Sequence, residues 1–183
     1  MPRINSFKPI EDKNAEVLIL GSMPGLASLT VGQYYAHAQN AFWRILSELL
    51  QFDPASSYEL RVQALKSARI ALWDVLKSCA REGSLDAMIE SDAQTANDFE
   101  TFFGAHRKIK RIFFNGAKAA ACYRRHVLGA IDVGSSSYAR LPSTSPANAG
   151  MSFADKLSAW QAILRPNQST QRTVQLRSLR PIK

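Results

Sequence analysis

The chain has 183 residues, 46% hydrophobic and 21% charged, which is the size and balance of one globular domain and excludes a disordered tail or a fibre. Its 23 basic and 15 acidic side chains give a formal net charge of +8, which favours an acidic binding partner over a neutral metabolite. No apolar run is long enough for a membrane span, and the first ten residues lack the apolar core of a signal peptide. We therefore expect a cytoplasmic protein without membrane contact.

The charge is unevenly distributed along the chain. Residues 1–100 hold 9 basic and 13 acidic side chains, a balance of −4, whereas residues 101–183 hold 14 basic and 2 acidic side chains, a balance of +12. This asymmetry suggests that the second half faces a polyanion, with a merely soluble basic surface as the alternative.

Cysteine and histidine usage argues against a metal enzyme. Cys79 and Cys122 are too few for a disulfide framework and are not spaced like zinc ligands. The three histidines are scattered, without acidic or thiol neighbours at ligand spacing. We expect two buried thiols in a reducing cytoplasm, and neither a metal nor another cofactor.

Short apolar runs alternate along the chain with segments of helical spacing. In chain order the pattern predicts a strand at Val17–Leu20, a helix after an N-cap at Asn40, a helix at Ser57–Ser67, a strand at Ala68–Val75, a strand at Arg111–Asn115, a helix at Ala117–Val127, a strand at Tyr138–Leu141 and a helix at Phe153–Leu164. Strands that alternate with helices favour an α/β fold with a parallel sheet covered on both faces. In such sheets the chemistry gathers in loops at the carboxyl ends of the strands.

The chain shows no internal repeat and no convincing linker. We expect a single domain over residues 1–165. Residues 166–183 contain four basic side chains and no acidic one, which suggests a basic C-terminal tail, or equally a final edge element.

Three loops carry the residues of chemical interest. The GSMPG loop, residues 21–25, places glycines on either side of a proline, which suits a tight turn whose amides approach a ligand, yet it matches neither the dinucleotide fingerprint nor the P-loop. The aromatic segment, residues 33–43 (QYYAHAQNAFW), offers rings that stack on a base and carboxamides that read a base edge or hold a water. The LPSTSP loop, residues 141–146, is stiff and offers hydroxyls to phosphate oxygens. Taken singly, each also fits an ordinary turn, a helix cap or a lid on the core.

Taken together and in this order, the three loops resemble the uracil-DNA glycosylase superfamily, most closely its hypoxanthine-DNA glycosylase branch. The resemblance extends over roughly residues 16–160 and takes in LWDVLKSCAREGSLDAMI (72–89) and FFNGAKA (113–119). It implies a three-layer α/β/α fold with a central four-stranded parallel sheet, and hydrolysis of the N-glycosidic bond of a deaminated base in DNA. The iron–sulfur branches need four cysteines, so this chain does not belong to them.

The resemblance also implies roles for individual residues. The mismatch-specific branch has a water-orienting Asn in its first motif, where this chain has Met23, whereas in the hypoxanthine branch the catalytic Asn falls at the position of Asn40. Tyr35 matches the aromatic residue that stacks on the flipped base. Gly21, Ser22, Met23 and Pro24 match the pocket wall, and Ser143, Thr144, Ser145 and Pro146 match the loop that contacts phosphates and inserts into the duplex. Leu141 stands where the superfamily often has a hydrogen-bond donor to the leaving base. Which residue of this chain replaces that donor is left open.

Other polar residues near strand ends keep two interpretations. Asn115 is a candidate reader of the base edge or a stabiliser of its loop. Trp73, Asp74, Arg81 and Ser84 line the pocket or brace the first loop, and we assign no acid role to Asp74, Glu82 or Asp86.

The sequence therefore predicts a monomeric DNA glycosylase that excises hypoxanthine. A uracil glycosylase of the same fold and a non-catalytic DNA-binding module are the alternatives.

Overall fold

The structure is a computed structural model, and it describes residues 3–80, 94–131, 134 and 136–165. Its centre is a four-stranded sheet in the order β3-β2-β6-β7, with all three neighbouring pairs parallel. The strands are β2 (Val17–Gly21), β3 (Ile70–Asp74), β6 (Arg111–Asn115) and β7 (Ser137–Leu141). This arrangement confirms the parallel four-stranded sheet expected from the sequence.

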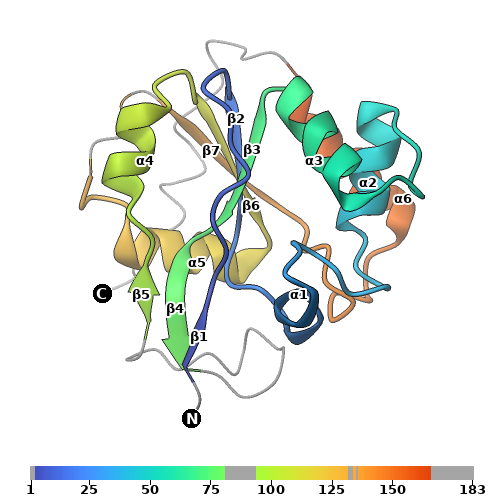
Figure 1. Cartoon of the computed structure of the whole chain (residues 1–183), viewed down its shortest axis with the longest axis horizontal. Helices are drawn as coiled ribbons and strands as arrows, with labels where there is room; N and C mark the ends of the chain where they lie inside the picture. The colour runs from blue at the N-terminus through green and yellow to red at the C-terminus, as the bar shows by residue number, and fades with distance from the viewer. Residues whose placement is uncertain (1–2, 81–93, 132–133, 135, 166–183) are drawn as a thin grey trace.

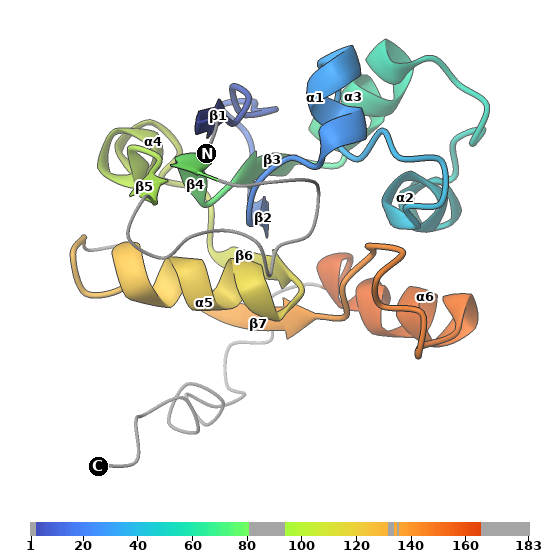
Figure 2. The ribbon, with the colours of Figure 1, turned by 90° about the horizontal axis from the view of Figure 1, so that it is seen from below.

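Helices cover both faces of the sheet. Figure 1 shows α2 (Phe42–Leu50), α3 (Tyr58–Ser67) and α6 (Phe153–Trp160) on one side, and α4 (Phe99–Ala105) and α5 (Ala117–His126) on the other. Figure 2 shows α5 running along β6 and β7. The three layers predicted from the sequence are therefore present.

The central strand explains why two layers of helix are needed. All five residues of β2 are buried, and successive side chains point to opposite faces. Leu18 and Leu20 join the core beneath α4 and α5, whereas Val17 and Ile19 join the core beneath α2, α3 and α6. A strand that is apolar on both faces requires cover on both.

A second, smaller sheet was missed by the sequence analysis. It is antiparallel, in the order β1-β4-β5, and consists of β1 (Arg3–Asn5), β4 (Leu76–Ala80) and β5 (Thr95–Ala96). β1 and β5 have three and two residues, too few for an apolar alternation to identify them, and β4 (LKSCA) has no continuous apolar run. The short helix α1 (Leu26–Val31) and α4 were missed as well. Of the residues given two interpretations above, Arg81, Glu82, Ser84 and Asp86 lie outside the described part of the chain.

Element boundaries differ from expectation at three places. The N-cap of α2 is Ala41 and not Asn40, because the Ala41 carbonyl accepts the first helical hydrogen bond, from the Ile45 amide at 2.8 Å. The predicted strand at 68–75 begins two residues later, after Arg69, whose φ is +59°. The last helix ends at Trp160 and continues as a 3-10 turn, η3 (Gln161–Ile163). The proposed tail, residues 166–183, lies outside the described residues.

Within the described residues, no helix is long and apolar enough to cross a membrane. Both cysteines, Cys79 and Cys122, are free and buried, as the sequence led us to expect.

Candidate active site

The four parallel strands end at one pocket. Its lining includes the last residue of each strand, Gly21, Asp74, Asn115 and Leu141, and its volume is about 980 Å³. The strands end level because Gly21 pairs with Asp74, and Asn115 with Leu141. The rest of the wall comes from the GSMPG loop, the aromatic segment, the LPSTSP loop and the first residues of α1 and α5. The structure thus brings together Asn40, Tyr35, Asn115 and the residues selected in the GSMPG and LPSTSP loops, whereas Trp73, also offered as a lining residue, is buried in the core and does not line the pocket.

The GSMPG loop is held against the end of β3. The Val75 amide donates to the Gly21 carbonyl at 2.9 Å, and the Leu76 amide donates to the Ser22 carbonyl at 3.1 Å. A Cβ on Gly21 would lie 2.4 Å from Asp74 Oδ1 and 2.9 Å from the Tyr35 hydroxyl oxygen, so the close approach requires glycine. Met23 is buried and lines the pocket, where its thioether is too weak an acceptor to orient a water.

The two adjacent tyrosines of the aromatic segment have different surroundings. Tyr34 is buried, donates its hydroxyl to the Lys8 carbonyl at 3.1 Å, and accepts at its own carbonyl from Trp43 Nε1 at 2.7 Å. Burial raises the pKa of Tyr34 far above its ordinary value, and the charge of Asp74 adds to this effect. The Tyr34 anchor therefore stays neutral and fixes the segment to the core.

Tyr35 lines the pocket instead. Its ring stacks on the buried Phe42 ring, with the centroids 4.0 Å apart and the planes at 22°. Its backbone adopts φ +55°, a conformation that few non-glycine residues take and that recurs at functional sites. Since Phe42 covers one face of the ring, Tyr35 is a rigid platform at the pocket wall.

Asn40 lies between the aromatic segment and α2 and also lines the pocket. Its Oδ1 accepts a hydrogen bond from the Phe42 amide at 3.0 Å, so it satisfies a helix N-terminal donor from one position before the cap. The backbone amide of Asn40 donates to the His37 carbonyl at 2.8 Å. The bond from the Phe42 amide fixes the carboxamide, which keeps two Nδ2 hydrogens and a second Oδ1 lone pair as bonding capacity.

A pair of reciprocal hydrogen bonds ties the end of β6 to the LPSTSP loop. Asn115 Nδ2 donates to Thr144 Oγ1 at 2.8 Å, and the Thr144 amide donates to Asn115 Oδ1 at 2.9 Å. The Thr144 carbonyl accepts from the Ala41 amide at 3.0 Å, directly beside Asn40. Of the two interpretations of Asn115, loop stabilisation is visible here, and each polar atom of its carboxamide keeps capacity for one further bond.

The LPSTSP loop and the start of α5 form a site that suits an anion. Ser143 Oγ accepts from the Ser145 amide at 3.2 Å, and Ser145 Oγ accepts from the Ala147 amide at 3.2 Å, so each hydroxyl keeps its hydrogen for an outside acceptor. Gly116, the N-cap of α5, has φ +90° and gives the helix no side-chain cap. The uncapped amides and Lys118 border the pocket, where they favour negative charge.

Asp74 is the pocket residue to which the sequence analysis gave no chemical role. Its side chain is 3% exposed, and its Oδ2 accepts from the Ser6 hydroxyl at 2.7 Å. Its Oδ1 lies beside Gly21, and both residues line the pocket. Of the two interpretations that the sequence analysis gave Asp74, lining the pocket is the one that the structure shows.

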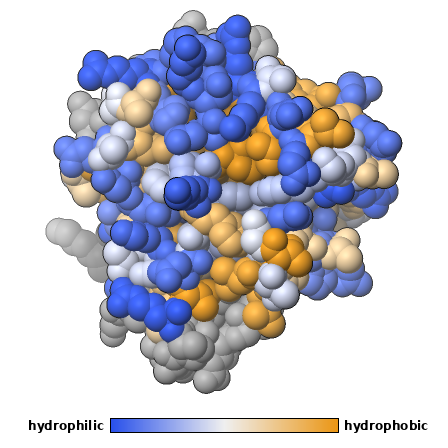
Figure 3. All heavy atoms as spheres, viewed as in Figure 1, coloured by the Kyte–Doolittle hydropathy of each residue, from blue (hydrophilic) through white to orange (hydrophobic). Residues whose placement is uncertain are grey.

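Hydrophobic side chains frame the pocket mouth. Leu26 of α1 is 58% exposed and Met151 is 38% exposed, and both line the pocket. Figure 3 shows apolar side chains gathered over α1 and the neighbouring strands on a surface that is otherwise mostly hydrophilic. Exposed apolar groups at a pocket rim are typical of a binding face.

A doubly covered parallel sheet with a strand-end pocket, a stacked aromatic platform and fixed carboxamides is an arrangement that suits a planar ring. The family model of the uracil DNA glycosylase superfamily matches residues 7–164, and the chain belongs to this superfamily. The resemblance stated from the sequence is thereby confirmed.

Two curated relatives carry the name hypoxanthine DNA glycosylase. The one from Methanosarcina barkeri (strain Fusaro) is 41% identical over 114 residues, which are 62% of this chain and 71% of the relative. The one from Methanosarcina acetivorans is 37% identical over 160 residues, or 87% of this chain and 96% of the relative. A solution NMR structure of a Methanosarcina acetivorans protein assigned to the uracil DNA glycosylases is similar with a TM-score of 0.75 and 35% identity, covering 90% of this chain and 98% of that one.

The tight contact at Gly21 gives a prediction about stability. In Gly21→Ala the new Cβ must displace the buried Asp74 carboxylate or the Tyr35 hydroxyl, so we expect a loss of about 1–3 kcal/mol in the free energy of unfolding. Gly104→Ala in α4 is the matched control, because nothing lies within 4 Å of its Cβ and alanine favours a helix by about 1 kcal/mol. Urea unfolding measures both, and equal stability of the two variants would contradict the contact.

Proposed function

We propose that this protein is a DNA glycosylase that hydrolyses the N-glycosidic bond of hypoxanthine in deoxyinosine-containing DNA and leaves an abasic site. The observation that carries the proposal is the pocket at the strand ends, where Asn40 and Tyr35 border the same cavity. The near full-length similarity to a hypoxanthine DNA glycosylase supports the choice of base. We further propose that the protein acts as a single copy, in the cytoplasm.

Excision begins with extrusion of the nucleotide, because a base inside a duplex is out of reach of the pocket. Flipping costs a few kcal/mol, and stacking on one aromatic ring returns about 1–3 kcal/mol. The ring of Tyr35 is already fixed against Phe42, so little further ordering is needed when the base stacks on it. Mispaired inosine is also cheaper to extrude than a well-paired base, which favours the damaged nucleotide.

Asn40 positions the attacking water or a polar atom of the base. A carboxamide does not titrate in the physiological range, so Asn40 is not a general base. Its bond from the Phe42 amide fixes the side chain before substrate arrives, and a prepositioned dipole contributes most when charge develops in the transition state. Hypoxanthine leaves as a reasonably stable anion, so the mechanism needs no strong acid.

Asp74 offers a way to tell a deaminated base from its parent. Hypoxanthine carries a hydrogen on N1, where adenine has a lone pair, and an ionised carboxylate only accepts hydrogen bonds. Asp74 lines the pocket with its Oδ1 beside Gly21, and a carboxylate oxygen there suits that N1–H donor and opposes adenine. Uracil has a similar N3–H that cytosine lacks, so Asp74 favours hypoxanthine over adenine and uracil over cytosine. Guanine also carries an N1–H, so its rejection and the purine preference must come from other features of the pocket.

The backbone of the flipped strand is held by the LPSTSP loop and the start of α5. The free hydroxyl hydrogens of Ser143 and Ser145 and the uncapped amides of α5 are donors for phosphate oxygens. Pro146 restricts the backbone of the loop, so the loop inserts into the duplex without a change of its own conformation.

A base panel tests the function directly. Labelled duplexes with a single inosine, uracil or xanthine are incubated with the protein and then cleaved with alkali at abasic sites. We expect the fastest product formation from inosine. A faster reaction with uracil would support the alternative glycosylase, and the absence of product from all three would leave only the non-catalytic module.

Asn40→Ala tests the catalytic assignment. We expect single-turnover excision of hypoxanthine to fall by about 100-fold or more, the usual effect of removing one prepositioned polar group. The dissociation constant for inosine-containing DNA should stay within about threefold of the wild-type value, because phosphate contacts dominate affinity.

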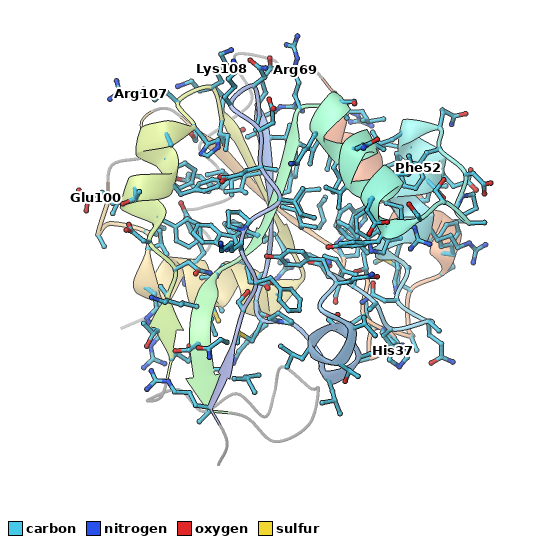
Figure 4. The ribbon with its side chains drawn as sticks, in the orientation of Figure 1. His37, Phe52, Arg69, Glu100, Arg107 and Lys108 are labelled. Carbon is cyan, nitrogen blue, oxygen red and sulfur yellow. The ribbon has the colours of Figure 1, made fainter. Side chains whose placement is uncertain are left out.

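The control is Asn14→Ala, since the Asn14 side chain bonds Lys108, which lies away from His37 and the pocket mouth (Figure 4). Circular dichroism verifies that both variants are folded at the assay temperature. Excision by Asn40→Ala at the wild-type rate would reduce Asn40 to a helix-capping role.

A further inference from the structure

A second cleft lies on the other side of the segment that holds Tyr35 and Asn40. We propose that it binds the DNA phosphates that flank the flipped nucleotide, through Arg44 and Arg61. The inference rests on the proposed function, since it takes DNA as the substrate, and it adds a binding site that lies outside the base pocket.

The second cleft adjoins the pocket at the strand ends. Its volume is about 590 Å³, and it shares Tyr35, His37 and Asn40 with the pocket. The remaining wall comes from residues 31, 33, 36 and 38 and from α2, α3 and the loop between them. A strand that inserts one nucleotide into the pocket therefore passes the cleft with an adjoining nucleotide.

The charge of the second cleft is positive. Arg44 and Arg61 line it together with His37, and its lining includes no acidic residue. Neither arginine forms an ion pair with the acidic side chains in the described ranges. An anion that enters the cleft thus meets two guanidinium groups without competition from a bound carboxylate.

Both guanidinium groups are held in place before any ligand binds. Arg61 donates from Nε to the Ser56 carbonyl at 2.9 Å and from Nη2 to the Pro54 carbonyl at 3.1 Å. The Arg44 guanidinium carbon lies 3.8 Å from the centroid of the Phe153 ring. A guanidinium that is already oriented loses less side-chain entropy on binding, and its fork of donors fits phosphate oxygens.

The placement of the basic groups matches a strand that crosses the pocket. Lys118 and Arg140 line the base pocket, whereas Arg44 and Arg61 line the cleft beyond Asn40. Phosphates on both sides of a flipped nucleotide would each have a basic partner. Since Arg44 and Arg61 belong to the half of the chain with a net charge of −4, their shared position at this cleft is a local feature and does not follow from the overall charge.

Arg44→Gln and Arg61→Gln test the site. A phosphate contact is not sequence-specific, so each change should raise the dissociation constant about three- to tenfold for inosine-containing and undamaged duplexes alike. The slope of log Kd against log salt should fall by about one for each arginine removed. The single-turnover rate at saturating DNA should be unchanged, because neither arginine lines the base pocket.

The matched control is Arg107→Gln. Arg107 is exposed, also donates to a backbone carbonyl, that of Gly104, and lies on the side of the molecule away from His37 (Figure 4). Because Arg61 also braces its loop, the exposed Arg44 provides a test that does not depend on loop stability.

Neutral methylphosphonates locate the contact. Each duplex carries one methylphosphonate in place of one phosphate that flanks inosine. We expect one of these replacements to weaken DNA binding by the wild type and to have no further effect on binding by the arginine variants. The site is refuted if Arg107→Gln weakens binding as much, or if every methylphosphonate remains additive with both variants. These binding results stand apart from catalysis: a wild-type protein that binds but releases no base would overturn the proposed function alone.

Discussion

The base pocket depends on the two hydrogen bonds between Asn115 and Thr144. Thr144 is 1% exposed, so its amide and hydroxyl would be left unsatisfied in the interior without Asn115. Through its carbonyl, Thr144 also holds the Ala41 amide and with it the chain around Asn40. One buried polar connection thus joins the end of β6, the LPSTSP loop proposed to contact phosphate and the segment that carries Asn40. The proposed contact with the DNA backbone and the proposed place of glycosidic bond cleavage are thereby held in one geometry.

The remaining framework follows from burying a parallel sheet on both faces. The strands end level, and the pocket needs a residue without a side chain at Gly21, because Asp74 and Tyr35 both approach it. The aromatic segment is supported in the same way, since the buried Tyr34 anchors the backbone while its neighbour Tyr35 rests on Phe42. Rigid support of this kind suits a reaction in which the substrate, and not the protein, makes the large movement.

Much of this could be predicted from the sequence, and the parts that could not have physical reasons. The apolar run in β2 and the helical spacing after Asn40 are patterns among residues that are close in sequence. The parallel sheet and its helices were therefore predictable. Motif order placed Tyr35 and Asn40 in the site, and both line the pocket. Asn115 and Thr144 are 29 residues apart, and no local pattern predicts their pairing. The second sheet pairs β1 with β4 across more than seventy residues, and the cleft of Arg44 and Arg61 requires α2 and α3 to be packed together. The division of charge along the chain indicated a polyanion, but it did not predict a basic cleft within the half whose net charge is −4.

The central claim is that a flipped hypoxanthine occupies the strand-end pocket against Tyr35, next to Asn40. A crystal structure of the Asn40→Ala variant bound to a duplex with one deoxyinosine tests it most directly. The account predicts an extrahelical hypoxanthine ring parallel to the Tyr35 ring, with the adjoining phosphate at Ser143 and the start of α5. An inosine that remains stacked in the duplex, or a base that occupies a different part of the protein, would contradict it.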